Sequence, residues 1–110
     1  MVLYYNLVSS EEFRPVACAQ QFDSVAQLEQ LLEKMRCTED SVSLYDSHSA
    51  VRIMFFYEEK HTYICEISNA RNGMVFSRSL GKEDVQNLDL VSLKNYIEDP
   101  LSNGFCGEGF

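Results

Sequence analysis

Apolar and polar residues alternate along much of the chain, as expected for strands with one buried face. The clearest runs cover residues 2–8, 42–45, 51–57, 63–67 and 74–79. Residues 16–22 are a weaker candidate, because Gln20 interrupts the alternation and Pro15 suits only the edge or the start of a strand. The runs from residue 42 onward are joined by short polar connections, so we expect them to form an antiparallel meander.

A helical pattern separates the weak run from the meander. Apolar residues recur every three or four positions behind Ser24-x-x-Gln27, a capping-box sequence whose two side chains can each bond a free backbone N–H at a helix start. This pattern predicts a helix over about residues 25–36. Lys34 and Arg36 lie in its last turn, where positive charge suits the negative end of the helix dipole.

Residues 81–99 also have helical spacing, which is interrupted at Asp89, a candidate N-cap, and ended by Pro100. This order of elements predicts an α+β fold: a mainly antiparallel sheet of four to six strands, with the helices packed on one face. We expect a single α+β domain over residues 1–100. Residues 101–110 contain three Gly and two Phe and are expected to form a C-terminal tail.

The sheet face away from the helices is expected to be unusually apolar. Between the core positions of the strand near residue 54 lie Arg52, Met54 and Phe56, and neighbouring runs add Tyr45 and Ile64. A solvent-facing side of an antiparallel sheet normally alternates to polar residues, whereas this one keeps large apolar side chains. We therefore expect the tail, a second copy of the chain or a partner protein to cover it.

The chain of 110 residues has 17 Asp and Glu against 9 Lys and Arg, a net charge of −8. Sequence-independent binding to nucleic acid or to an anionic membrane needs clustered Lys and Arg, and here they are scattered, so neither is expected as a direct partner. No stretch has the length and apolarity of a membrane helix, and the first twelve residues lack the pattern of a signal peptide. We expect a charged partner to be a basic protein.

Cysteines at positions 18, 37, 65 and 106 include no Cys-x-x-Cys pair, so we expect no metal site. Two disulfides are the alternative in an oxidising compartment, but we expect reduced thiols in the cytoplasm, with Cys18 and Cys65 in apolar segments. His61 and Cys65 cannot form a base–nucleophile pair within one strand, because four residues span about 13 Å. The sequence therefore predicts no catalytic residue and no cofactor.

Acidic residues occur in pairs at the ends of the predicted elements. We expect several of these pairs to form a negative surface that speeds the encounter with a basic partner, while a few desolvated aromatic side chains supply most of the affinity. The candidate partner-binding residues are Glu58, Glu59, Glu83, Asp84, Glu98, Asp99, Tyr45 and Phe56.

A small acidic α+β domain without a catalytic motif is typical of stoichiometric inhibitors. The leading hypothesis is a non-enzymatic interaction protein that inhibits a basic toxin, nuclease or other nucleic-acid-handling protein, as immunity proteins and phage-encoded anti-defence proteins do. One alternative is an accessory or homo-oligomeric subunit that uses its apolar sheet face, so that the chain is a monomer or a homodimer. Another is a small-molecule binder or cysteine-dependent enzyme, which needs a cavity lined by His48, His61, Cys65 or the tyrosines.

Overall fold

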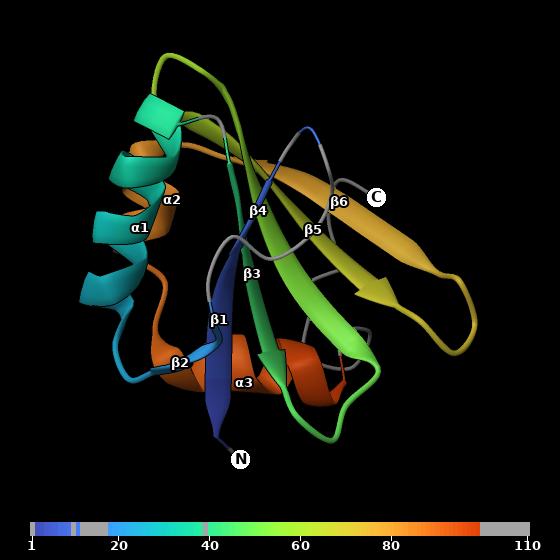
Figure 1. Ribbon diagram of the computed structural model, residues 1–110. Coiled ribbons are helices and arrows are strands. Elements are labelled where there is room, and N and C mark those ends of the chain that lie inside the picture. Colours follow the sequence, from blue (N-terminus) through green and yellow to red (C-terminus); the bar gives the residue numbers. More distant parts are fainter. Residues whose placement is uncertain (1, 10, 12–17, 39, 100–110) are drawn as a thin grey trace.

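The computed structural model of the chain describes residues 2–9, 11, 18–38 and 40–99. The elements, in chain order, are β1 (Leu3–Val8), β2 (Gln20–Phe22), α1 (Val25–Thr38), β3 (Ser41–Asp46), β4 (Val51–Glu59), β5 (Thr62–Asn69), β6 (Val75–Leu80), α2 (Lys82–Gln86) and α3 (Leu90–Glu98) (Figure 1). The predicted tail, residues 101–110, lies outside the described residues.

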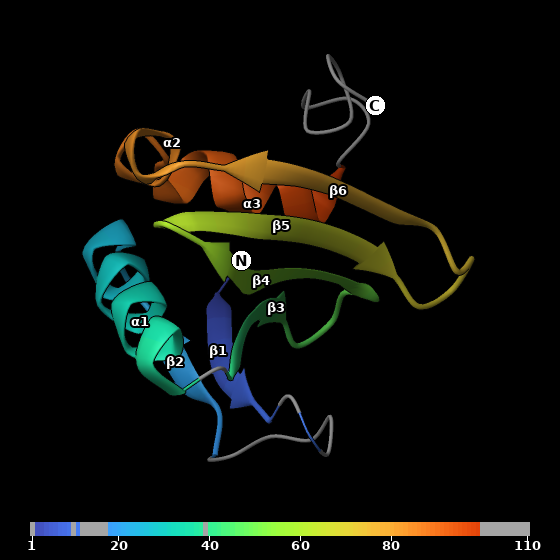
Figure 2. The ribbon, with the colours of Figure 1, turned by 90° about the horizontal axis from the view of Figure 1, so that it is seen from above.

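All six strands of the described chain pair antiparallel in one sheet, in the order β2-β1-β3-β4-β5-β6. β3 to β6 form the predicted meander, and β1 pairs with β3 and β2 beside it. α1 packs on β3 and β4, α3 packs on β4, and α2 contacts α1 and β6. Figures 1 and 2 show the strong twist of this sheet and the helices gathered against it. The predicted α+β fold with an antiparallel sheet is confirmed.

The hydrophobic core lies between the helices and one face of the sheet. The residues of β4 that were predicted to face the core do so, because Ile53 and Phe55 are completely buried. Ile53 pairs with Leu44 on one side and with Ile67 on the other, so the buried face continues across three strands. The helices contribute their own buried apolar residues, namely Leu28, Leu32, Met35, Val85, Leu93 and Ile97. Each such side chain stabilises the fold by about 1.5–3 kcal/mol when it is removed from water.

Two helix starts were expected from capping sequences. At α3 the Asp89 carboxylate accepts the backbone N–H of Ser92 at 2.7 Å, which confirms the predicted N-cap. At α1 one half of the predicted capping box is present, because the Gln27 side-chain oxygen accepts the backbone N–H of Ser24 at 3.0 Å. That oxygen also accepts the N–H of Asp23, so Gln27 fixes the chain as it enters the helix.

Two element boundaries differ from expectation. β2 covers Gln20–Phe22 alone, and Cys18 is exposed before it, while residues 16 and 17 lie outside the described residues. The polar run Glu58-Glu59-Lys60 predicts the tip of the β4–β5 hairpin, but β4 continues through both glutamates and the tip is Lys60 and His61. The Asn-Gly pair at residues 72–73 predicts a turn over residues 69–73, and the structure has this turn, with Gly73 at a φ of +72°. No helix in the described part of the chain is long and apolar enough to cross a membrane.

Candidate functional site

The sheet has a second face, away from the helices, which we call the far face. The register pairs Tyr45 with Tyr4 on one side and with Arg52 on the other. On the neighbouring strands Phe56 pairs with Ile64. The register therefore confirms that Tyr45, Arg52, Phe56 and Ile64 share this face, as predicted. In Figure 1 the far face is turned toward the viewer, and α3 crosses behind the strands. Its large side chains include Tyr4, Tyr45, Arg52, Met54, Phe56, Ile64 and Glu66.

Tyr45, one of the two predicted aromatic contact residues, is already held between neighbours. Its ring centroid lies 6.1 Å from that of Tyr4, and the Arg52 guanidinium carbon lies 4.8 Å above the ring. This distance is within the range of a cation–π contact. On the side that Arg52 covers, Tyr45 therefore presents a positive charge to a partner and not its bare ring.

Phe56, the other predicted aromatic contact residue, lies farther along the same face. It follows Arg52 by four positions in β4, which is about 13 Å in an extended strand. Phe56 is half-buried. The structure thus places the two aromatic residues on one face but near different ends of the strands.

The far face is not uniformly accessible to solvent. Ser43, in β3, is completely buried there, and its hydroxyl has no hydrogen-bond partner among the residues that the structure describes. Asn6, which pairs with Ser43 across the strands, is also buried. Met54 and Phe56 in β4 are half-buried, so they are more accessible than Ser43 and Asn6 at the centre of β3 and β1. The predicted cover by residues 101–110 falls outside the described residues.

The acidic pairs do not converge on one surface. The Glu58–Glu59 pair ends β4, and the Glu83–Asp84 pair lies in α2, directly after the end of β6. Because the strands are antiparallel, both pairs lie at the end of the sheet that carries the β4–β5 turn, which we call the hairpin end. The Glu98–Asp99 pair lines a cavity with the first residue of β4, at the opposite end of the sheet.

Carboxylates at the hairpin end are mostly free of short ion pairs. Within the described residues, the one ion pair joins Glu33 to Arg36 on α1. Asp84 accepts the backbone N–H of Gly81 at 2.8 Å and so serves as a helix cap, whereas Glu58 and Glu59 are exposed. Cations lie close by in sequence, at positions 60 and 82, and moderate the negative charge of this end.

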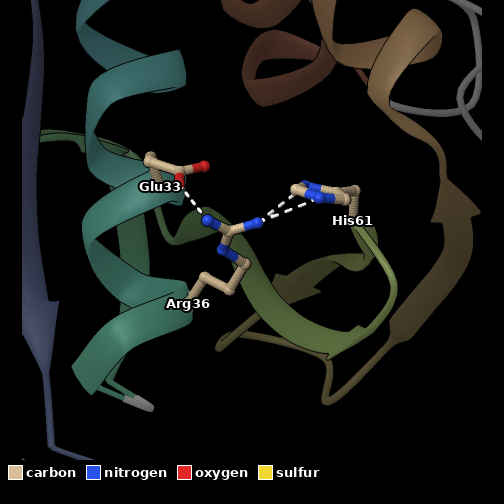
Figure 3. A network of polar contacts seen from close by, with 3 residues as sticks. All are labelled: Glu33, Arg36 and His61. Atoms are coloured by element: carbon tan, nitrogen blue, oxygen red, sulfur yellow. Dashed lines mark hydrogen bonds and ion pairs between the residues drawn. The ribbon is translucent and has the colours of Figure 1, made fainter.

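Arg36 joins α1 to the β4–β5 turn (Figure 3). Its guanidinium is ion-paired with Glu33, one helical turn earlier, and its Nη1 lies 3.0 Å from both ring nitrogens of His61. Lys60 and His61 have φ angles of 49° and 62°, a left-handed conformation that suits a two-residue hairpin turn but is unfavourable for residues other than glycine. The contact with Arg36 holds this strained turn against the helix.

A cavity of about 160 Å³ lies beside this contact, between α1, α2 and the start of β5. Its apolar lining comes from the buried residues Leu32, Tyr63 and Val85, and charged side chains surround it. Burial, together with the nearby Glu33 carboxylate, raises the pKa of the Tyr63 hydroxyl above its ordinary value. This hydroxyl therefore stays protonated at neutral pH. His61 also lines the cavity, so a histidine and a tyrosine converge there.

The three described cysteines are free thiols in two different environments. Cys65 is buried in β5, which confirms its expected place, and burial raises its pKa to about 12. At neutral pH it is a neutral thiol and a poor nucleophile. Cys18 and Cys37 are exposed, so the expectation of an apolar setting for Cys18 was wrong. Within the described ranges no three His, Cys, Asp or Glu side chains are grouped so as to hold a metal ion.

The contact between Arg36 and His61 was missed by sequence reasoning. The two residues are 25 positions apart and come from different elements. The one available signal, an arginine in the last turn of a helix, has a sufficient local explanation in the helix dipole. Nothing in the pattern around His61 shows that the hairpin tip reaches α1.

No protein-family model matches the chain, and neither does any curated protein sequence or solved structure. A functional proposal therefore rests on the residues and geometry described above.

Proposed function

We propose that the chain is a non-enzymatic interaction protein of the cytoplasm that binds a basic protein and inhibits it stoichiometrically. The partner class that suits this chemistry is a toxin, a nuclease or another nucleic-acid-handling protein, because a cleft that binds phosphates is rich in Lys and Arg. Immunity proteins and phage-encoded anti-defence proteins act in this way. The observation that carries the proposal is the position of Phe56 beside the exposed Glu58–Glu59 pair at the hairpin end.

This arrangement combines the two features that a tight complex with a basic surface needs. Phe56 precedes Glu58 by two positions, or about 7 Å along a strand, so one partner can cover the ring and pair with the carboxylate at once. The Glu83–Asp84 pair adds negative charge at the same end of the sheet. Binding energy in such interfaces is concentrated in a few desolvated anchors, and charges around them mainly accelerate association.

The other predicted contact residues have smaller roles in this proposal. Tyr45 lies under Arg52, which repels a basic surface, so it is a weaker anchor than Phe56. The Glu98–Asp99 pair lies at the opposite end of the sheet and contributes to long-range attraction alone. This attraction decays over a Debye length of about 8 Å at physiological salt.

The test begins with affinity capture from the native host, which supplies the partner, and continues with purified proteins. We expect a basic partner, one-to-one binding and loss of the partner's activity at one equivalent of the chain. Replacing Glu58 and Glu59 by Gln should slow association and weaken its dependence on salt. The matched control, E98Q/D99N, removes the same charge at the opposite end and should slow association less.

Phe56→Ala should instead accelerate dissociation, at a cost of about 2 kcal/mol or more in affinity. Three results would overturn the proposal: a captured partner that is not basic, a partner that stays active when saturated with the chain, or an association rate that is independent of salt in the wild type and in both charge variants. Thermal unfolding of each variant confirms that it is folded.

A second candidate function rests on the cavity beside Tyr63. At about 160 Å³ it is smaller than the roughly 300–1,000 Å³ of most ligand pockets, so it suits a small polar compound and not a large cofactor. A compound of this kind that raises the melting temperature of the wild type but not of Tyr63→Phe would support small-molecule binding. Equal stabilisation of both proteins would place the compound elsewhere.

A further inference from the structure

The two edges of the sheet are built differently. β2 is an edge of three residues, Gln20–Phe22, and short edge strands offer little template for pairing with another chain. β6, at the other edge, runs over six residues, Val75–Leu80. It contains no proline, its pairing with β5 has no bulge, and Arg78 is its one charged residue. β6 therefore lacks two of the usual features that prevent an edge strand from pairing, a proline and a bulge, and Arg78 is the one such feature that it carries.

The backbone groups on the outer side of β6 can be identified from its register. At the hairpin turn the Asn69 N–H donates to the Met74 carbonyl at 2.9 Å, so residue 74 bonds toward β5. Backbone groups alternate in direction along an antiparallel strand. Val75, Ser77 and Ser79 therefore point their N–H and C=O groups away from β5. In the sheet of the described residues no strand lies on that side of β6.

We propose that β6 pairs with β6 of a second copy of this chain, antiparallel and around a two-fold axis at Ser77, so that the two sheets become one. In this register Ser77 faces Ser77 of the second copy, and Val75 faces Ser79. All three outward residues of each copy then lie in hydrogen-bonded pairs, and each such pair exchanges two backbone hydrogen bonds.

Side-chain chemistry selects the same register. On the side of the sheet that the helices cover, a two-fold axis at Ser77 sets Arg78 of each copy opposite Phe76 of the other, and cation–aromatic neighbours are favourable. A two-fold axis at Arg78 would oppose the two arginines directly. An axis at Phe76 would bring Ser79 opposite residue 73, beyond the start of the strand. The Ser77 register alone uses the full strand and avoids like charges.

Charge also permits this pairing, although each chain carries −8. β6 has no carboxylate, so the contact itself is not acidic. Antiparallel pairing brings the β5–β6 turn of one copy, which carries Arg71, toward the first turn of α2 in the other, where Glu83 and Asp84 follow Lys82 and leave a net negative charge. The acidic pair next to the edge thus finds a positive neighbour. β4, which carries Phe56 and the Glu58–Glu59 pair, lies two strands in from the edge, so the dimer leaves these three residues accessible. The Glu83–Asp84 pair is then shared between the dimer contact and the proposed inhibitory surface.

Sedimentation of the full chain over about a hundredfold range of concentration tests this proposal. We expect a concentration-dependent dimer. Ser77→Lys places two ammonium groups opposite each other and should weaken the dimer about tenfold or more, and Ser77→Glu should do the same. The matched control is Gln21→Lys, which adds the same charge at the other edge of the sheet and should leave the dimer unchanged.

Mixing the two charge variants gives the sharpest result. Ser77→Lys and Ser77→Glu should form a heterodimer when combined, because residue 77 of one copy faces residue 77 of the other. Ser77→Pro offers a second route: it removes an N–H that points away from β5, so the sheet should stay intact while the dimer is lost. Circular dichroism confirms that each variant is folded.

Several results would overturn the proposal. One is a wild-type chain that stays monomeric over the whole concentration range. Another is a dimer that survives both Ser77→Lys and Ser77→Pro, which would place the contact between copies elsewhere, with the far face as the first alternative. A mixture of Ser77→Lys and Ser77→Glu that remains monomeric would exclude the two-fold axis at Ser77.

Discussion

Phe55 and Phe56 are neighbours in β4, yet they belong to opposite faces of the sheet. Phe55 is completely buried under the helices, where it pairs with Val42 and Cys65 of the adjacent strands. Phe56 is half-buried on the far face. The two residues have the same side chain, the same strand and nearly the same sequence context. Their difference shows that the two-residue period of the strand, combined with the position of the helices, decides which aromatic ring stabilises the fold and which is available for binding.

The largest expected effect comes from truncating these two rings in turn. Phe55→Ala should lower the free energy of unfolding by about 3–5 kcal/mol, because it removes a buried ring and leaves a cavity. Phe56→Ala should lower it by about 1 kcal/mol, since much of the ring is already in water. Urea denaturation measures both values. If Phe55→Ala does not fold, Phe55→Leu gives a smaller loss of the same origin.

Equal losses from the two truncations would contradict the comparison. They would mean that the far face is packed as tightly as the core, and Phe56 would then be a structural residue and not a candidate anchor.

Alkaline pH should destabilise the helix-covered face through Cys65. Its pKa is about 12 in the folded protein, against about 8.5 in an unfolded chain. The folded state therefore keeps a proton that the unfolded state loses, so the free energy of unfolding is unaffected below about pH 8.5. Above that pH it should fall by up to about 1.4 kcal/mol per pH unit.

Urea denaturation between about pH 8.5 and 10 measures this slope. The measurements stop at about pH 10, because above that pH Tyr63, whose pKa is also raised in the folded protein, would lower the free energy of unfolding as well. Cys65→Ala is the control and should show a smaller slope.

In the native protein Cys18 and Cys37 should react rapidly with a thiol reagent, while Cys65 reacts only on unfolding. We also expect four free thiols under denaturing, non-reducing conditions.

The smallest expected effect concerns the polar residue buried on the far face. Ser43→Ala should leave the free energy of unfolding unchanged or raise it by about 1 kcal/mol, because its buried hydroxyl lacks a partner within the described residues. Val42→Ala, at the adjacent position on the core face, should lower the free energy of unfolding, since it removes buried apolar atoms. A clear loss of stability in Ser43→Ala would show that the hydroxyl bonds a group that the structure does not describe.

Much of the fold could be predicted because its signals are local. The alternation of apolar and polar residues predicted which residues of β4 face the core. It therefore predicted that Phe55 and Phe56 lie on opposite faces of the sheet. The order of the elements indicated an antiparallel meander, because short connections join neighbouring strands. β2 was less predictable, since a three-residue edge strand carries too few positions for a period to show. The hairpin tip was predicted at Glu58-Glu59-Lys60 and lies slightly later, at Lys60 and His61, because left-handed turns normally use Gly, Asn or Asp and neither residue marks the turn.

The candidate site was predictable in its parts but not in its arrangement. The sequence indicated that Tyr45 and Phe56 share a face, because both lie on the non-core phase of their strands. It did not show that Arg52 covers Tyr45, since that contact depends on the register between β3 and β4. It also did not show that the acidic pairs divide between two ends of the sheet, which follows from strand direction and from the place of α3.

The sequence by itself determined the elements, their buried phases, the negative charge and the absence of any recognised motif, because each of these depends on residues close together in the chain. The tertiary structure decided which distant groups meet, such as Arg36 with His61, and which edge strand of the described residues, β6, is long and has no strand on its outer side. These contacts depend on how whole elements pack and on the register between strands. No period in a single segment records that information, so only the folded chain shows it.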